Sequence, residues 1–164
     1  MGKDNVLQIR ARLLEQLKDD LTEDYTAAEY IPEEESGIPA GEVTVMFDTL
    51  GINSNDIFGE IFFLPDADDA AAVSYFECVL LISDTLDNAD MPALSAECVK
   101  QNNASPAGYF YVDEENGRLL YKLGVPVSFD SEETAVYKEM NMAVGCALSI
   151  VDRSVDELIV LAEG

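Results

Sequence analysis

Carboxylates are the most abundant side chains in this sequence that could do acid–base chemistry. The 164 residues hold 33 Asp and Glu, 9 Lys and Arg, and no histidine. Without histidine, neither a Ser-His-Asp triad nor a Cys-His pair can form, and no metal site can use imidazole. The phosphate loops G-x-G-x-x-G and G-x-x-x-x-G-K-[ST] are absent, and so is the S-x-x-K motif. We therefore expect no enzymatic activity and no cofactor.

Two carboxylate patterns stay open as alternatives. Asp66, Asp68 and Glu77 have the spacing of positions one, three and twelve of a calcium-binding EF-hand loop. Ala70 and Ala71 stand where that loop needs a ligand and a glycine, so we expect a solvated turn without metal. A hydrolase would require a defined pair of carboxylates, and the sequence singles out no pair among its acids.

The cysteine pattern and the apolar runs indicate a compartment. Cys78, Cys98 and Cys146 are widely spaced and form no C-x-x-C pair, which is typical of buried free thiols in a reducing environment. The N-terminal residues lack an apolar signal core. The longest apolar stretch, residues 142–151, has about half of the ~20 residues that a membrane helix needs. We expect a cytoplasmic protein that does not enter a membrane.

The negative charge is large and unevenly distributed. The formal net charge is -24, and no Lys or Arg occurs between Lys18 and Lys100, a stretch that holds 20 of the 33 acids. Such a field repels nucleic-acid phosphates and anionic membranes and attracts cationic segments, so we expect no binding to nucleic acid. Three interpretations stay open: the acids keep the protein in solution, they bind a basic partner, or they mimic DNA phosphates.

A candidate docking motif for a basic partner lies within this acidic stretch. It combines the run Glu33-Glu34-Glu35 with Tyr30 and Ile31. The alternative role of Tyr30 and Ile31 is to hold the segment on the domain.

The apolar periodicity predicts a single α+β domain, residues 1–164, with one twisted antiparallel sheet of about five strands. An amphipathic helix is expected over 4–21, with Arg10 among the charged residues on its solvent side. Proline and glycine predict an acidic linker at 22–41, either a surface loop or one helical turn near Ala27. The remaining elements are three strands in 42–84, a helix at 91–103, a hairpin at 107–127 that turns at Asn116-Gly117, and a helix at 131–162.

Two capping boxes are predicted along the last helix. Asp130 with Glu133 would begin it, and Ser154 with Glu157 would begin a second segment. If the second box forms, the helix is interrupted near Asp152.

The predicted strand at 56–64 is apolar on both sides. Its alternate residues form two sets: Ile57, Ile61 and Phe63 on one side, and Phe58, Phe62 and Leu64 on the other. A monomer rarely leaves a contiguous apolar patch in water. We therefore predict a two-fold homodimer with Phe58, Phe62 and Leu64 at its interface.

The C-terminal half carries a resemblance to a known family. A helix ending in Lys100-Gln101-Asn102 precedes Gly108-Tyr109-Phe110-Tyr111-Val112-Asp113, and Gly117-Arg118-Leu119-Leu120-Tyr121-Lys122-Leu123-Gly124-Val125-Pro126-Val127 follows. Over about residues 94–160 this pattern resembles the YbjN family of bacterial sensory transduction regulators, with Tyr121, Lys122 and Pro126 at signature positions.

The resemblance implies a fold like that of type III secretion chaperones, in the order helix, three strands, helix, two strands, helix. It also implies a small acidic protein-binding fold that is often dimeric and has no catalytic residues. We therefore expect a non-catalytic protein- or peptide-binding module of regulatory or chaperone-like type, whose partner carries a basic segment. An acidic immunity or inhibitor protein that captures a basic partner is the alternative.

Overall fold

The computed structural model describes residues 3–25, 27–65 and 73–164, which form five helices and six strands. In chain order these are α1 (Lys3–Asp24), β1 (Ala27–Ile31), α2 (Glu33–Ser36), β2 (Glu42–Leu50), β3 (Asn55–Phe63), β4 (Val73–Ser83), α3 (Met91–Ala104), β5 (Tyr109–Asp113), β6 (Arg118–Ser128), α4 (Glu133–Asp152) and α5 (Val155–Glu163). The strands pair antiparallel in one sheet of order β1-β2-β3-β4-β6-β5. The predicted α+β class is confirmed, with six strands instead of about five. Asp66 and Asp68 of the EF-hand-like pattern lie outside the described residues.

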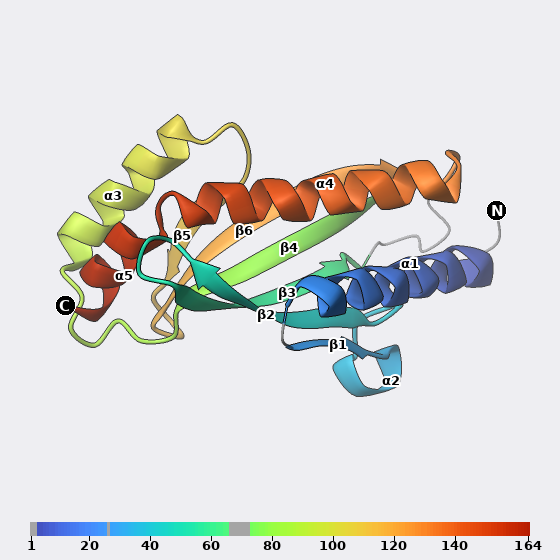
Figure 1. The fold of residues 1–164 in the computed structure, drawn as a ribbon, viewed down its shortest axis with the longest axis horizontal. Coiled ribbons are helices and arrows are strands. Elements are labelled where there is room, and N and C mark those ends of the chain that lie inside the picture. The colour runs from blue at the N-terminus through green and yellow to red at the C-terminus, as the bar shows by residue number, and fades with distance from the viewer. Residues whose placement is uncertain (1–2, 26, 66–72) are drawn as a thin grey trace.

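Long helices cover one face of this sheet (Figure 1). α1 lies along β1 and β2, α4 lies along β6 and β4, and α3 packs against β5 and α5 at one end. Leucines of α1, the apolar stripe of α4 and the inner side of the strands form one buried core. The hairpin pairs Val112 with Leu119, as expected from the Asn116-Gly117 turn.

The segment expected to be a linker, residues 22–41, contains an edge strand. β1 pairs with β2 along its whole length, from Ala27 opposite Met46 to Ile31 opposite Glu42. Pro32 ends β1 because proline has no N–H to donate, and the helical turn forms after it, at α2, instead of near Ala27. The five residues of β1 include two alanines, which have low strand propensity, so the pattern alone did not reveal the strand.

Both predicted capping boxes are absent. α4 begins after Glu132, which makes no side-chain cap hydrogen bond, instead of being capped by Asp130. The predicted break does occur, because α4 ends at Asp152 and α5 begins at Val155. Ser154 precedes α5 without a side-chain cap hydrogen bond, and its hydroxyl donates instead to Oε1 of Gln101 on α3 at 2.8 Å.

The turn between β2 and β3 is held by the start of α5. Asp156 accepts hydrogen bonds from the backbone N–H of Ile52 at 2.7 Å and of Asn53 at 3.2 Å, and from Nδ2 of Asn55 at 2.9 Å. Asp152 accepts another from the backbone N–H of Gly51 at 2.9 Å. The hydrogen bonds to Asp156, led by those from Asn55 and Ile52, lower the pKa of its carboxyl. The break in the C-terminal helix thus fixes the far end of the β2–β3 hairpin.

Arg10 corrects the expected polarity of the first helix. Its side chain is fully buried, where the helical pattern had placed it on the solvent side. Its guanidinium donates to the hydroxyl of Ser74 and lies 5.6 Å from the ring centroid of Phe63 and 5.7 Å from that of Phe129. The faces of aromatic rings attract a cation, and Arg is more weakly hydrated than Lys, so this position tolerates the burial.

Candidate protein-binding surface

The face of the sheet opposite α1 and α4 is the candidate site. In β2 and β3 burial alternates residue by residue: side chains toward the helices are buried, and those on the other side are half-buried or exposed. We call the side of the sheet that carries Met46, Phe58 and Leu81 the open face. Exposed Tyr75 and Tyr109 belong to it as well, each about half accessible.

An apolar row crosses the open face through all six strands. The pairing register places these side chains side by side in the order Ala27, Met46, Phe58, Leu81, Leu120 and Tyr111. Five strand spacings of ~4.8 Å give this apolar row a length of about 24 Å. Antiparallel strands bring such side chains within contact of one another, so the row is continuous.

Two shallow hollows flank Phe58 along the apolar row. The first has a volume of about 360 Å³, and its lining includes Ala27, Glu29, Met46 and Phe58. The second, of about 200 Å³, lies on the other side of the same ring and is lined in part by Leu81 and Leu120. The surface is therefore shaped to receive side chains on both sides of Phe58.

Acidic side chains stand beside the apolar row on its β1–β3 half. The neighbouring register row contains Glu29 and Glu60, both exposed, with Thr44 between them. Asp56 and Glu60 precede and follow Phe58 by two residues, so they lie on the same side of β3 and bracket its ring. Partial burial and the charge of Glu60 raise the pKa of Glu42, which lies diagonally across on β2. No Lys or Arg occurs in β1, β2 or β3; the cations that share a hollow with these acids come from other elements, Arg118 of β6 with Glu60 and Lys18 of α1 with Glu29.

The β4–β6 half of the open face is electrically balanced. Nζ of Lys122 lies 2.7 Å from Oε2 of the buried Glu77. Burial acts to lower the pKa of Lys122, but the hydrogen bond to Glu77 and the charge of that carboxylate outweigh it, so that pKa is raised. The rings of Tyr109 and Tyr111 lie 5.6 Å apart beside this pair. The open face thus has an acidic end and a neutral, aromatic end.

The predicted docking motif lies at the end of β1 and on α2. Glu33, Glu34 and Glu35 are all exposed on α2, and Oε2 of Glu33 accepts a hydrogen bond from the backbone N–H of Ala40 at 3.2 Å. The hydroxyl of Tyr30 donates to the carbonyl of Ala40 at 2.9 Å. Both contacts lie within the segment 22–41 and hold the β1–β2 connection in place.

The remaining predicted site residues lie near the open face. Ile31 is half-buried and pairs with Glu42 on the acidic half. Phe58, Phe62 and Leu64 are all half-buried, and only Phe58 belongs to the apolar row. Sequence reasoning missed the alignment of the row because β1 was not predicted as a strand and because β4 pairs with β6, which does not follow it directly in the chain.

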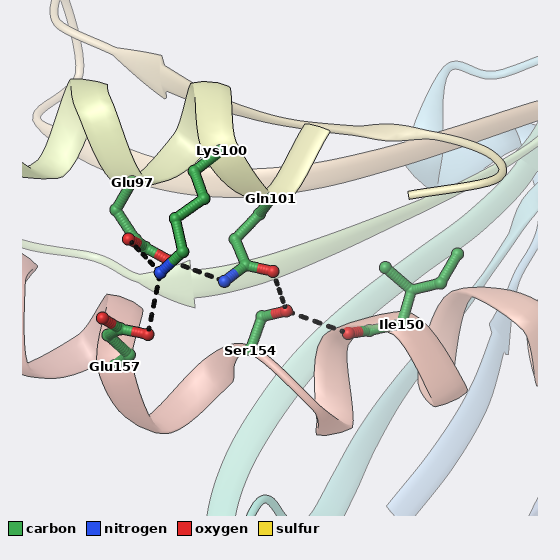
Figure 2. Close-up of polar contacts among 6 residues, drawn as sticks. All are labelled: Glu97, Lys100, Gln101, Ile150, Ser154 and Glu157. Atoms are coloured by element: carbon green, nitrogen blue, oxygen red, sulfur yellow. Dashed lines mark hydrogen bonds and ion pairs between the residues drawn. The ribbon is translucent and has the colours of Figure 1, made fainter. Parts of the chain in front are cut away.

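A second polar cluster joins α3 to α5 (Figure 2). Nζ of Lys100 lies 2.9 Å from the carboxylate of buried Glu97 and 3.7 Å from that of Glu157, and Gln101 donates to Glu97 at 2.6 Å. These hydrogen bonds, led by that from Lys100, lower the pKa of Glu97. The hydroxyl of Ser154 donates to the amide oxygen of Gln101, which is no general base, so the cluster offers no activated nucleophile. It joins helices.

Two further observations concern the described part of the chain. Within residues 3–25, 27–65 and 73–164, no group of three or more Cys, Asp and Glu side chains is placed to hold a metal ion. Over the same residues, no helix is long and apolar enough to cross a bilayer. Comparison with protein-family models, with curated proteins and with solved structures finds no match to this chain.

Proposed function

We propose that this chain is a non-catalytic protein-binding module of regulatory or chaperone-like type, whose open face holds an apolar, positively charged segment of a partner. The observation that carries the proposal is the apolar row across six strands, all of it half-buried or exposed except Leu120, beside acids on three strands that contain no Lys or Arg. The YbjN-like pattern of residues 94–160 supports the same class of function.

The two kinds of side chain on the open face have different roles in this proposal. Burial of the apolar row supplies the free energy of association, at about 25 cal/mol per Å² of apolar area removed from water. Glu29, Asp56 and Glu60 select a cationic partner and accelerate its approach. Screening over about 8 Å at physiological ionic strength should slow association as salt rises, whereas acids that only confer solubility would leave binding indifferent to salt.

Selection from a phage-displayed library of random peptides tests this function. Peptides that bind the protein should combine apolar residues with Lys or Arg, and they should lose affinity for the Phe58→Ser variant. Met142→Ser is the matched control, because Met142 is an exposed apolar residue of α4, on the covered side of the sheet. Selected peptides without basic residues, or peptides that bind Phe58→Ser as tightly as the parent, would contradict the proposal.

A further inference from the structure

We infer that the segment held by the open face is an amphipathic α-helix of about 16 residues that lies along the apolar row. This inference rests on the proposed function and specifies the partner's conformation, length and charge. It follows from the direction of the apolar row, its length and the placement of the acids.

The direction of the apolar row favours a helix. The row runs across the strands on a face of the sheet, where the backbone groups of β1 to β6 already pair with one another. An extended segment laid along the row would find no backbone partners there, and its own N–H and C=O groups would lose water without replacement. A helix satisfies these groups internally and presents only side chains to the sheet.

The dimensions of the apolar row agree with a helix. At 1.5 Å per residue, the row's ~24 Å corresponds to about 16 helical residues. One helical turn rises ~5.4 Å, close to the ~4.8 Å between strands, so each turn can place one apolar side chain over each strand. Side chains from successive turns would enter the two hollows on either side of Phe58.

The acids set the charge and the direction of the helix. Asp56 and Glu60 lie about 7 Å along β3 on either side of Phe58, within reach of Lys or Arg on both flanks of a helix. On the β4–β6 half, the charges of Glu77 and Lys122 cancel each other. The basic residues of the partner helix therefore belong to the part of that helix that lies over β1–β3. The N-terminus of a helix is the positive end of its dipole and is attracted to carboxylates. The N-terminus of the partner helix therefore lies over the acidic side chains at the β1 edge of the sheet.

A second copy of this chain fits the open face less well. A two-fold contact through Phe58 would bring Asp56 and Glu60 close to the same residues of the other copy, and like charges across an interface cost several kcal/mol. The homodimer predicted from the sequence is therefore the alternative occupant of the open face, and sedimentation velocity distinguishes it from the helix.

Synthetic peptides of one composition provide the test. The first has leucines at helical spacing and four lysines in its N-terminal half, the second has the lysines in its C-terminal half, and the third alternates leucine with polar residues as a strand would. Affinity is measured by fluorescence anisotropy and peptide helicity by circular dichroism. We expect the first peptide to bind most tightly and to gain helicity on binding.

Two variants and one control assign the binding to the open face. Phe58→Ser should weaken the first peptide by roughly ten-fold or more. Glu60→Gln, an isosteric change at an exposed position, should weaken it by about two- to five-fold. Glu115→Gln, in the exposed turn between β5 and β6, removes the same charge far from the acidic half and should leave the affinity unchanged.

Failure of the helix and failure of the function are distinguishable. If the strand-patterned peptide binds best, or if library-selected peptides bind through Phe58 without gaining helicity, the helix is overturned and the protein-binding function stands. If no peptide shows binding that depends on Phe58, both are overturned. A dimer in sedimentation velocity that Phe58→Ser abolishes would show a second copy on the open face and would also overturn the inference.

Discussion

Replacing Gly59 by alanine should destabilise the protein, although alanine favours ordered backbone. Gly59 lies on the covered side of β3, and a Cβ there would stand 2.6 Å from Cε2 of Phe47 and 3.1 Å from Cδ2 of Leu80. The ring of Phe47 is fully buried and packs edge-on against Tyr25, with 4.9 Å between centroids, so it has little room to move. The space that a side chain at residue 59 would need is therefore already filled by Phe47 and Leu80.

The expected magnitude combines two opposing effects. Overpacking a core by one methyl group costs about 1–3 kcal/mol. Removing a glycine from a strand returns about 0.5–1 kcal/mol through the unfolded state. Taking the middle of each range, the net loss in the free energy of unfolding should be about 1 kcal/mol, equivalent to a fall in Tm of about 2–4 °C for a chain of this length.

Gly145 supplies the matched control. It lies in the middle of α4, is exposed, and a Cβ there would have no neighbour within 4 Å. Gly145→Ala should stabilise the protein by about 0.5–1 kcal/mol, because alanine is the better helix former. The same substitution thus has opposite signs at two positions of one chain.

Urea unfolding followed by circular dichroism measures both variants and a double mutant. Phe47→Leu removes the ring atoms that the new Cβ would meet, so Gly59→Ala should cost less in that background, with a coupling of at least ~0.5 kcal/mol. A Gly59→Ala protein as stable as the parent, or strict additivity with Phe47→Leu, would refute the packing argument.

Acid should loosen the contact between α5 and the β2–β3 turn. The pKa of Asp156 is lowered in the folded protein from the usual 3.8, so its stabilisation is complete above the unfolded value and is lost as pH falls through the folded value. Asp156→Asn should flatten the fall in urea midpoint below about pH 4, and an unchanged acid slope would contradict this. Tyr121 is fully buried and its hydroxyl donates to the carbonyl of Ala107 at 2.9 Å, so Tyr121→Phe should cost about 1–2 kcal/mol in calorimetry. An unperturbed Tm would mean that this bond contributes nothing. Gly41 has φ +77 and a Cβ there would lie 2.5 Å from the carbonyl oxygen of Ile31, so Gly41→Ala should speed amide exchange in β1 and not in β4. Equal exchange in both strands would show that β1 adapts without strain.

Most helices and strands of this fold could be predicted from the spacing of apolar residues, because each element turns one apolar side toward the same core. The stripe of Leu13, Leu17 and Leu21 in α1 and the turn at Asn116-Gly117 each determine local structure within a few residues. β1 was missed because a short edge strand takes its structure from its partner β2 rather than from its own residues.

Arg10 and the apolar row show a different limit. Charge type predicts exposure on average, and Arg10 departs from that average because Phe63 and Phe129, from other parts of the chain, surround it with ring faces. The alternation of residues in β3 was enough to place Phe58 on the side of the strand opposite Ile57 and Ile61. The alignment of Phe58 with Leu120 was not evident, since the register of β4 with β6 is a property of the folded sheet.

The strand order has a consequence for the protein during its synthesis. β4 is completed at Ser83, but its neighbour β6 is completed only at Ser128, 45 residues later. Synthesis adds about 5–20 residues per second, so one edge of β4 in the nascent β1–β4 sheet stays unpaired for roughly 2–9 s. An unpaired strand edge invites pairing with another chain. Residues 19–99 of each nascent chain carry acids and no Lys or Arg, so neighbouring nascent chains on one polysome repel one another. This repulsion acts until β6 of the β5–β6 hairpin pairs with the free edge of β4.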